Sequence, residues 1–132
     1  MSHPLESLRI LELGQVIAGT YGSQVLSDLG AEVIKEETQE GDLGRNPSVA
    51  PYHGLSGLFL TFNRNKQSIV INLKTEAGRN IFCDLVKISD VVMDNFRPGV
   101  LERLQIDYAT LSRINPRIIH CSVNGFGTEG AY

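Results

Sequence analysis

The sequence predicts an α/β fold built on a mainly parallel sheet with helices on both faces. Strand-like and helix-like segments alternate along the chain, and no internal repeat interrupts them. Hydrophobic residues make up 42% of the 132 residues, and no stretch approaches the roughly 20 apolar residues of a membrane span. A chain of this size can bury most of its apolar surface in one core, so we expect a single domain over residues 1–132.

The first 35 residues predict a strand, a helix and a second strand. Residues 8–13 alternate and then become apolar, as a strand does, and residues 14–19 follow as a loop. Residues 21–29 carry Val25, Leu26 and Leu29 at helical spacing, and Gly30 ends that helix. Residues 31–35 form the second strand. A unit of this kind pairs its strands in parallel, with a right-handed crossover.

The middle of the chain begins with a long acidic segment that is rich in glycine and proline. Residues 36–56 show no lasting periodicity, and a loop of this length inside a domain is often functional. Residues 67–72 resemble a strand. Thr75 then opens a helix whose expected apolar face is Ile81, Phe82, Leu85 and Val86.

The last third continues the alternation. We expect a short buried strand at residues 90–93, a turn or short helix over residues 98–104, a helix over residues 108–114 and a strand over residues 117–123. In parallel α/β sheets, ligands bind beyond the carboxyl ends of the strands. The loops expected at that edge begin at Gly14, Lys35, Asn72, Asp94 and Asn124.

Two patterns carry residues suited to an anionic ligand. Phe96 and Arg97 follow a buried strand, where the ring could stack on a planar base and the guanidinium could bind a phosphate. Arg64 and Lys66 precede another strand and Lys74 follows it, although flanking cations alone more often only keep a strand soluble.

A third pattern, near the end of the sequence, is rich in glycine. Residues 125–130 match G-x-G-x-x-G after a strand, as in NAD-binding loops. That loop requires a following helix and an acidic residue about 20 positions further on, so a glycine-rich surface loop is favoured over an NAD site.

Composition excludes several classes of function. A net charge of −3 argues against general attraction to nucleic acid or to a membrane surface. Cys83 and Cys121 fit reduced, buried thiols, and the start of the chain does not resemble a secretory signal. The three histidines are too scattered for a metal centre, and His120 is expected to be a hydrogen-bonded core residue of a buried strand.

Several motifs in order resemble the class III CoA-transferases, a family that includes formyl-CoA and succinyl-CoA transferases, carnitine-type CoA transferases and acyl-CoA racemases. Two of them are Asp-Leu-Gly-Ala-Glu-Val-Ile-Lys at residues 28–35 and Asp-Asn-Phe-Arg-Pro-Gly at residues 94–99. The resemblance runs from Leu5 to Tyr132, and its other blocks lie at residues 11–13, 16–19, 41–45, 63–69, 73–75 and 125–127.

The resemblance implies a Rossmann-like domain that holds coenzyme A (CoA) or acyl-CoA without a metal, in an interlocked homodimer. The implied CoA contacts are Val16, Ile17, Ala18, Ile71, Asn72, Leu73, Lys74, Asn95, Phe96, Arg97 and Arg103. The chain departs from the family pattern at Thr38, where relatives often have arginine, and at Asn124, where some transferases have lysine.

The resemblance also implies a reaction between an acyl-CoA and a free carboxylic acid. An aspartate attacks the thioester and then carries CoA as an aspartyl thioester. By the family pattern this aspartate lies beyond Tyr132, so no catalytic residue is assigned in this chain and the domain is expected to be incomplete. A non-catalytic CoA- or nucleotide-binding module and an acyl-CoA racemase fragment stay open as alternatives. The expected location is the cytoplasm, or an organellar matrix in a eukaryote.

Overall fold

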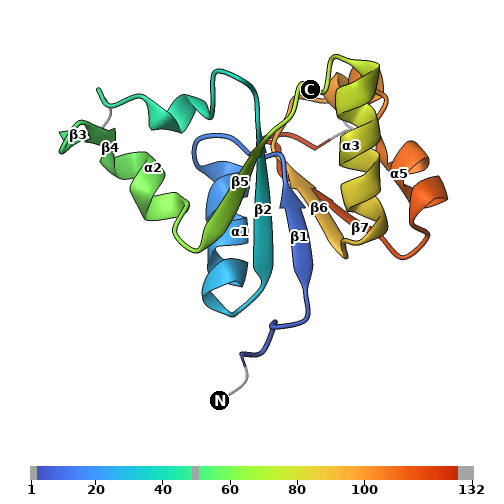
Figure 1. The fold of residues 1–132 in the computed structure, drawn as a ribbon, viewed down its shortest axis with the longest axis horizontal. Coiled ribbons are helices and arrows are strands. Elements are labelled where there is room, and N and C mark those ends of the chain that lie inside the picture. The colour runs from blue at the N-terminus through green and yellow to red at the C-terminus, as the bar shows by residue number, and fades with distance from the viewer. Residues whose placement is uncertain (1–2, 49–50, 128–132) are drawn as a thin grey trace.

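The computed structural model describes residues 3–48 and 51–127, and its centre is a parallel sheet of five strands (Figure 1). The strands lie in the order β5-β2-β1-β6-β7, so the chain builds outward from β1 on one side and then returns to build outward on the other. Their bounds are β1 Arg9–Glu12, β2 Glu32–Glu37, β5 Lys66–Val70, β6 Val91–Asp94 and β7 Ile119–Ser122. The parallel α/β fold expected from the sequence is confirmed.

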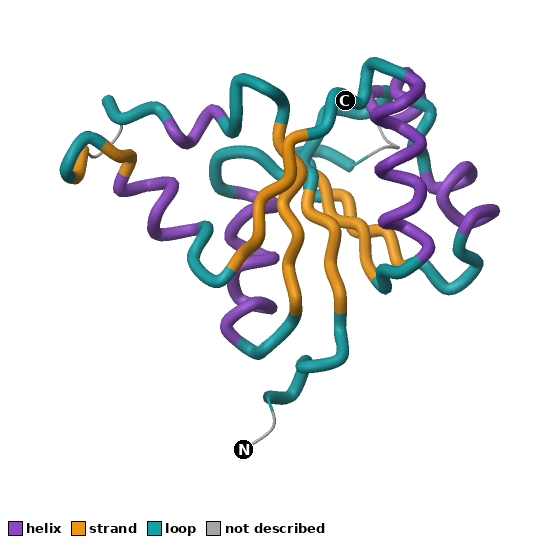
Figure 2. Tube along the Cα trace, viewed as in Figure 1, coloured by secondary structure: helices purple, strands orange, loops and turns teal. Residues whose placement is uncertain are grey.

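Helices cover both faces of this sheet, as Figure 2 shows. On one face lies α1 (Ala18–Asp28), and on the other lie α3 (Glu76–Lys87), α4 (Val100–Leu104) and α5 (Tyr108–Ile114). Successive strand residues alternate between the faces: Ile10 belongs to the core beneath α1, whereas Leu11 belongs to the larger core beneath α3 and α5. The sheet is therefore buried from both sides.

The buried face of α1 differs from the expected one. Val25 and Leu29 are both exposed, and of the three predicted apolar positions only Leu26 packs against the core. The helix instead buries small and polar residues: Gly19, Thr20, Ser23, Gln24 and Ser27. The cause is a buried set of charged side chains beneath α1, described below. Gly30 follows the helix at φ +100°, as the prediction of a glycine stop requires.

The segment predicted as a loop over residues 36–56 contains regular structure. β2 extends through Glu37, and a short 3₁₀ helix, η1 (Leu43–Arg45), follows it. A small hairpin of β3 (Pro51–Tyr52) and β4 (Leu55–Ser56) then leads into α2 (Gly57–Phe62), a helix that the sequence did not predict. In Figure 1 this segment extends to the left of the sheet. Ser56 caps α2 by accepting a hydrogen bond from the Phe59 amide at 3.2 Å.

The second half agrees more closely with the prediction. Thr75 caps α3 by accepting a hydrogen bond from the Gly78 amide at 3.1 Å, and Phe82 and Val86 are fully buried. Ile81 was wrongly assigned to the buried face, because it is 51% exposed on the outer side of α3. The strand at residues 117–123 was expected to be buried. In the structure β7 is only partly buried, because it lies at the edge of the sheet.

All five strands of the large sheet point the same way, so their carboxyl ends form one edge, uppermost in Figure 1. β1 and β6 are adjacent at the point where the strand order reverses direction. Crevices at such reversals are the usual ligand sites of doubly wound sheets. Within the described ranges, no helix has the length and apolar character needed to cross a membrane.

Candidate functional site

A cavity of about 650 Å³ opens at the carboxyl edge of the sheet. Its walls come from the loops after β1, β2, β5 and β6 and from one face of α4. They combine apolar side chains, two cations and two carboxylates. The lining residues are Gln15, Glu36, Thr38, Gln39, Glu40, Val70, Ile71, Asn72, Leu73, Lys74, Phe96, Val100, Arg103 and Leu104. This volume is within the range of small-molecule sites.

The loop after β1 is held at both sides by side chains from distant parts of the chain. Asn95 accepts a hydrogen bond from the Gln15 amide at 2.9 Å and donates one to the Gln15 carbonyl at 2.8 Å. Asp42 accepts a hydrogen bond from the Val16 amide at 3.0 Å. Val16 has φ +62°, a conformation that is strained for a β-branched residue. Asn95 and Asp42 therefore fix a loop that would otherwise relax.

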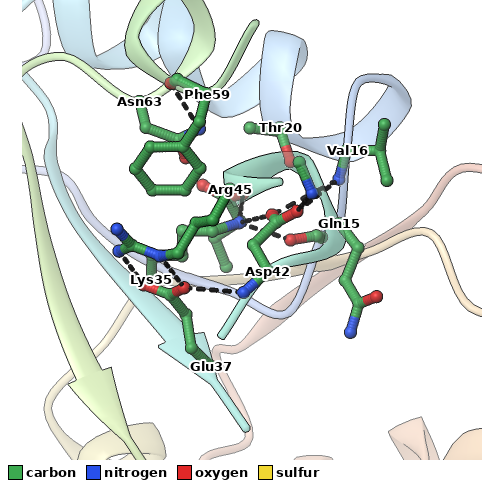
Figure 3. Close-up of polar contacts among 12 residues, drawn as sticks. Gln15, Val16, Thr20, Lys35, Glu37, Asp42, Arg45, Phe59 and Asn63 are labelled. Atoms are coloured by element: carbon green, nitrogen blue, oxygen red, sulfur yellow. Dashed lines mark hydrogen bonds and ion pairs between the residues drawn. The ribbon is translucent and has the colours of Figure 1, made fainter. Parts of the chain in front are cut away.

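Beneath this loop lies a buried cluster of charged side chains, part of which is drawn in Figure 3. The Lys35 ammonium lies 2.9 Å from Glu12 and 2.7 Å from Asp42, and it donates a hydrogen bond to the Gly14 carbonyl at 2.6 Å. Lys66 reaches the other Glu12 oxygen at 2.7 Å. All four side chains are at most 2% exposed, so each charge depends on its partners.

A second ion pair holds the segment after β2 against the sheet. Arg45 binds Glu37 with two hydrogen bonds of 2.6 Å, and its guanidinium lies 3.8 Å from the centre of the Phe59 ring (Figure 3). Burial by itself raises the pKa of Glu37, but hydrogen bonds from Arg45, Ser68 and the Asp42 amide outweigh it and lower the pKa to about 2. Glu37 therefore stays ionised and holds η1 in place.

Glu36, its neighbour on β2, has the opposite environment. Its side chain lines the cavity on the other face of the sheet, and the residue is only 8% exposed. Burial raises its pKa from an ordinary value of 4.5 to about 7; the Lys35 charge partly opposes this effect and the Glu37 charge adds to it. The cavity therefore contains a carboxyl group that changes its charge near neutral pH.

The structure brings together six of the eleven residues expected to contact CoA. Ile71, Asn72, Leu73, Lys74, Phe96 and Arg103 line the cavity. The remaining five do not line it: Val16, Ile17 and Ala18 lie in the loop before α1 and in its first turn, Asn95 holds that loop, and Arg97 is exposed beside the cavity.

Eight lining residues were not predicted: Gln15, Glu36, Thr38, Gln39, Glu40, Val70, Val100 and Leu104. Five of them, Gln15, Glu36, Thr38, Gln39 and Glu40, lie inside loops that the sequence had placed at the carboxyl edge, so treating each whole loop as a candidate would have found them. Thr38, one of the two positions at which the sequence departs from the pattern of the resembled family, lies in the lining.

The cations before and at the start of β5, Arg64 and Lys66, do not line the cavity. Lys66 is buried against Glu12 under α1, and its burial lowers its pKa although Glu12 raises it. Arg64 forms an ion pair with Asp28 at the end of α1. Of the three cations around this strand, only Lys74 lies at the cavity.

His120 is hydrogen-bonded, as expected, but it is not a core residue. Its Nε2 lies 2.7 Å from Asp94 Oδ2, and its ring stacks on Tyr108 with 6.2 Å between centres. The same Asp94 accepts a hydrogen bond from the Phe96 amide, which shapes the start of the loop after β6. In the part of the chain that the structure describes, no group of three or more His, Cys, Asp or Glu side chains is placed to hold a metal ion.

The glycine motif after β7 is only partly covered by the structure. Gly125 and Gly127 are described, and Asn124 accepts a hydrogen bond from the Phe126 amide at 3.3 Å. The third glycine, Gly130, lies outside the described residues.

Comparison with known proteins identifies a family for this fold and cavity. The chain is 45% identical to the acetyl-CoA:oxalate CoA-transferase of Acetobacter aceti over 129 residues, covering 96% of this chain and 33% of the relative. It is 42% identical over 128 residues to the succinyl-CoA:glutarate CoA-transferase of Mus musculus, covering 96% of this chain and 29% of the relative. The chain thus spans about a third of the length of these curated relatives.

Solved structures agree with these relatives. The crystal structure of a CaiB/BaiF family protein from Brucella suis matches all of this chain and 36% of its own, with a TM-score of 0.92 and 41% identity. That of the hypothetical protein Rv3272 from Mycobacterium tuberculosis gives a TM-score of 0.90 and 36% identity over 98% of this chain and 35% of its own. The family profile described as CoA-transferase family III matches residues 5–132. The chain therefore belongs to CoA-transferase family III.

Proposed function

We propose that this chain is the N-terminal, CoA-binding part of a CoA-transferase. The whole enzyme would move CoA between an acyl-CoA thioester and a free carboxylic acid, and residues 1–132 would form the CoA-binding domain without the downstream catalytic region. The observation that carries this proposal is the cavity of about 650 Å³ at the carboxyl edge, in a chain of this family.

The lining offers the kinds of group that CoA needs. Lys74 and Arg103 are exposed cations at the cavity, and each can form a charge-assisted hydrogen bond to a phosphate of CoA. Such a bond contributes roughly 1.5–3 kcal/mol when well formed. Phe96 and Ile71 offer apolar surface to the adenine ring or to the pantetheine arm. Arg97, exposed next to Phe96, is proposed as a further contact to a phosphate.

The loop before α1 supports a second group of contacts. No side chain caps the first turn of α1, and that turn contains no acidic residue. Free backbone amides and the helix dipole make such an end favourable for an anion. We therefore propose that Ile17 and Ala18 contact CoA mainly through their backbone amides, while Asn95 positions the loop. The Val16 amide already donates to Asp42, so Val16 is proposed to contact CoA through its carbonyl or its side chain.

The catalytic aspartate is proposed to lie beyond Tyr132. Among the described residues that line the cavity there is no aspartate. Asp42 and Asp94 are buried in the interactions described above, and Asp90 accepts a hydrogen bond from the Arg9 amide. In the proposed reaction the downstream aspartate attacks the thioester carbonyl and expels the CoA thiolate, which gives a mixed anhydride. The thiolate then attacks the aspartyl carbonyl of this anhydride, so the donor acid leaves as its carboxylate and an aspartyl-CoA thioester remains. The acceptor carboxylate attacks that thioester and expels the thiolate, which attacks the acceptor carbonyl, forms the new acyl-CoA and frees the aspartate.

Calorimetric titration of the protein with CoA tests whether Lys74 and Arg103 bind its phosphates. Replacing Lys74 or Arg103 by alanine is expected to weaken binding by about tenfold each, because one charge-assisted bond is lost. Lys87→Ala is the matched control, since Lys87 lies at the far end of α3 and pairs with Asp84. Unchanged affinity in both cavity variants would reject the phosphate role.

The absence of an aspartate from the described lining also keeps the non-catalytic CoA- or nucleotide-binding module as a second candidate. A thioester exchange assay with an acyl-CoA and a free carboxylic acid separates the two when it is run on the protein together with its proposed downstream region. Exchange by that protein would rule out the module, and racemisation of an acyl-CoA without exchange would identify the racemase alternative. Assembly as a homodimer and a location in the cytoplasm or an organellar matrix are part of the same proposal, and size measurement in solution tests the first.

A further inference from the structure

Among the described residues that line the cavity, Glu36 is the one with a buried side-chain oxygen that lacks a hydrogen-bond partner. Its Oε1 atom is buried, and no hydrogen bond to it is found among residues 3–48 and 51–127. Neither Glu36 oxygen takes part in an ion pair there, whereas the neighbouring Glu37 carboxyl has hydrogen bonds to Arg45 and Ser68. Buried polar atoms in native proteins nearly always have a partner, so an exception needs an explanation.

The position of Glu36 on β2 explains why no protein group reaches it. Side chains alternate along a strand, so Lys35 and Glu37 point to the α1 face and Glu36 points to the opposite face. There it lies beside β5, where Ile69 is its register partner, and at the apolar top of the larger core. Its carboxyl is therefore withdrawn from water and still faces the space that a ligand would fill.

We propose that the Glu36 carboxyl binds an uncharged hydrogen-bond donor on the nucleotide end of the ligand, either a ribose hydroxyl or the adenine amino group. The inference rests on the proposed binding of CoA in this cavity and adds a residue that determines specificity. In doubly wound folds with this strand order, an acidic residue at the end of the second strand, about 20 residues after the glycine loop, binds a ribose hydroxyl. Glu36 occupies the corresponding place, at the end of β2 after the loop that begins at Gly14.

The charges around the cavity favour one orientation of the nucleotide. Lys74 and Arg103 attract phosphates, whereas Glu36 and Glu40 repel them when ionised. Lys35 and Glu37 also act on Glu36 from the same strand, with opposite signs. The phosphates are thus expected at the two cations, and a neutral N–H or O–H donor at Glu36.

Ligand binding is expected to release a proton from Glu36 near neutral pH. Burial raises the pKa of this carboxyl to about 7, so a large part of it is protonated in the free protein at that pH. A donor that binds the carboxylate stabilises the ionised form and lowers its pKa. The proton leaves to the buffer as the hydrogen bond forms.

The test compares three ligands by calorimetry on the purified protein: adenosine 3′,5′-bisphosphate, its 2′-deoxy analogue and its inosine analogue. Wild-type protein is expected to bind one of the two analogues about tenfold or more weakly than the parent, because a hydrogen bond to a buried charge is lost. The 2′-deoxy result identifies the hydroxyl, and the inosine result identifies the amino group. Glu36→Leu is expected to bind all three ligands within about twofold of one another, because the acceptor is gone.

Two further variants distinguish the effect of the Glu36 carboxyl from the effect of removing any carboxyl in the cavity. Glu36→Gln keeps an acceptor oxygen, so it is expected to retain the discrimination and lose the proton release, measured at pH 7 in two buffers of different ionisation enthalpy. Glu40→Gln removes a second, exposed carboxyl from the same lining. It is expected to strengthen binding of all three bisphosphates alike, because a charge that repels phosphate is gone, and to keep the wild-type discrimination and proton release.

Equal binding of all three ligands by wild-type protein would overturn the inference. This comparison uses wild-type protein alone, so it does not depend on the folding of any variant. Undiminished discrimination by Glu36→Leu would overturn it as well. If wild-type protein binds none of the bisphosphates, the proposed function fails, and the Glu36 inference with it. Binding of the parent ligand without discrimination rejects the Glu36 role alone.

Discussion

Glu36 and Glu37 are adjacent carboxylates on β2, and their pKa values move in opposite directions. Glu36 faces the cavity without a hydrogen bond in the described structure, and burial raises its pKa to about 7. Glu37 faces the η1 segment, and although burial alone would raise its pKa, the hydrogen bonds from Arg45, Ser68 and the Asp42 amide lower it to about 2. The alternation of a strand thus gives two identical side chains different chemistry.

The raised pKa of Glu36 predicts a dependence of stability on pH. The folded state binds this proton more tightly than the unfolded state, so the stabilisation is present below pH 4.5 and is lost as the pH rises to about 7. Above that pH the ionised carboxylate costs on the order of 3 kcal/mol. Glu36→Gln removes the titration, so its gain in free energy of unfolding over wild type should grow between pH 4.5 and pH 8 in urea titrations.

Glu40→Gln is the control for that experiment, since Glu40 is exposed at the same cavity and its gain should not grow over the range. An equal difference between Glu36→Gln and wild type at both pH values would contradict the assignment. Glu37 has the opposite sign: its contribution is present above pH 4.5 and is lost as the pH falls toward 2.

At the scale of elements, the position of α3 depends on a glycine in its first turn. A Cβ atom at Gly78 would lie 2.0 Å from the backbone oxygen of Asn72 and 2.6 Å from its carbonyl carbon. Both are backbone atoms that cannot rotate away. The missing side chain lets α3 start directly against the segment that follows β5, and that segment forms one wall of the cavity.

Gly78→Ala is therefore expected to displace the backbone around Asn72. We expect a loss of about 1–3 kcal/mol in the free energy of unfolding, typical of an overpacked site, although alanine favours a helix over glycine. Nucleotide affinity should fall as well, because Lys74 moves with this segment. Ala77→Ser, at an exposed position of the same turn, should leave affinity unchanged. If denaturant titration shows that Gly78→Ala is as stable as wild type, the backbone around Asn72 can move aside without a cost in the free energy of unfolding, and the prediction is wrong.

The elements also show what the sequence could predict. The bounds of α5 and the Thr75 cap of α3 follow from local signals, and the structure confirms both. The buried face of α1 does not, because it packs over the Glu12 pairs with Lys35 and Lys66, which come from strands far apart in the sequence. Local periodicity contains no information about such partners.

The location of the candidate site could be predicted from the sequence, but one of its residues could not. The rule that ligands bind at the carboxyl ends of parallel strands located the loops of the cavity. The role of Glu36 was not predictable, since two consecutive glutamates in a sequence indicate a solvated position. Only the pairing of β2 with β1 and β5 shows that both of them are buried, and on opposite faces of the sheet.

Over the whole molecule, the two faces of the sheet are covered unequally. The α3, α4 and α5 helices cover the larger core. On the other face α1 contacts β1, β2 and β6, and Leu5 and Leu8 from the segment before β1 pack against the same smaller core. β7 lies beyond α1 at the edge of the sheet, and its Ile119 is 60% exposed. A parallel edge strand with an exposed apolar side chain can pair with or pack on another chain.

We expect the protein to self-associate through the β7 edge of its sheet. Wild-type protein should show an average mass that increases with concentration in sedimentation experiments, and Ile119→Lys should lower it, because a charge on an edge strand opposes packing of a second chain. Ile81→Lys is the matched control: Ile81 is 51% exposed but lies on the outer face of α3, away from any strand edge, so its removal should leave the association unchanged. If both variants reduce the mass equally, general surface hydrophobicity is the cause. A wild-type protein that stays monomeric at all concentrations would reject the role of β7.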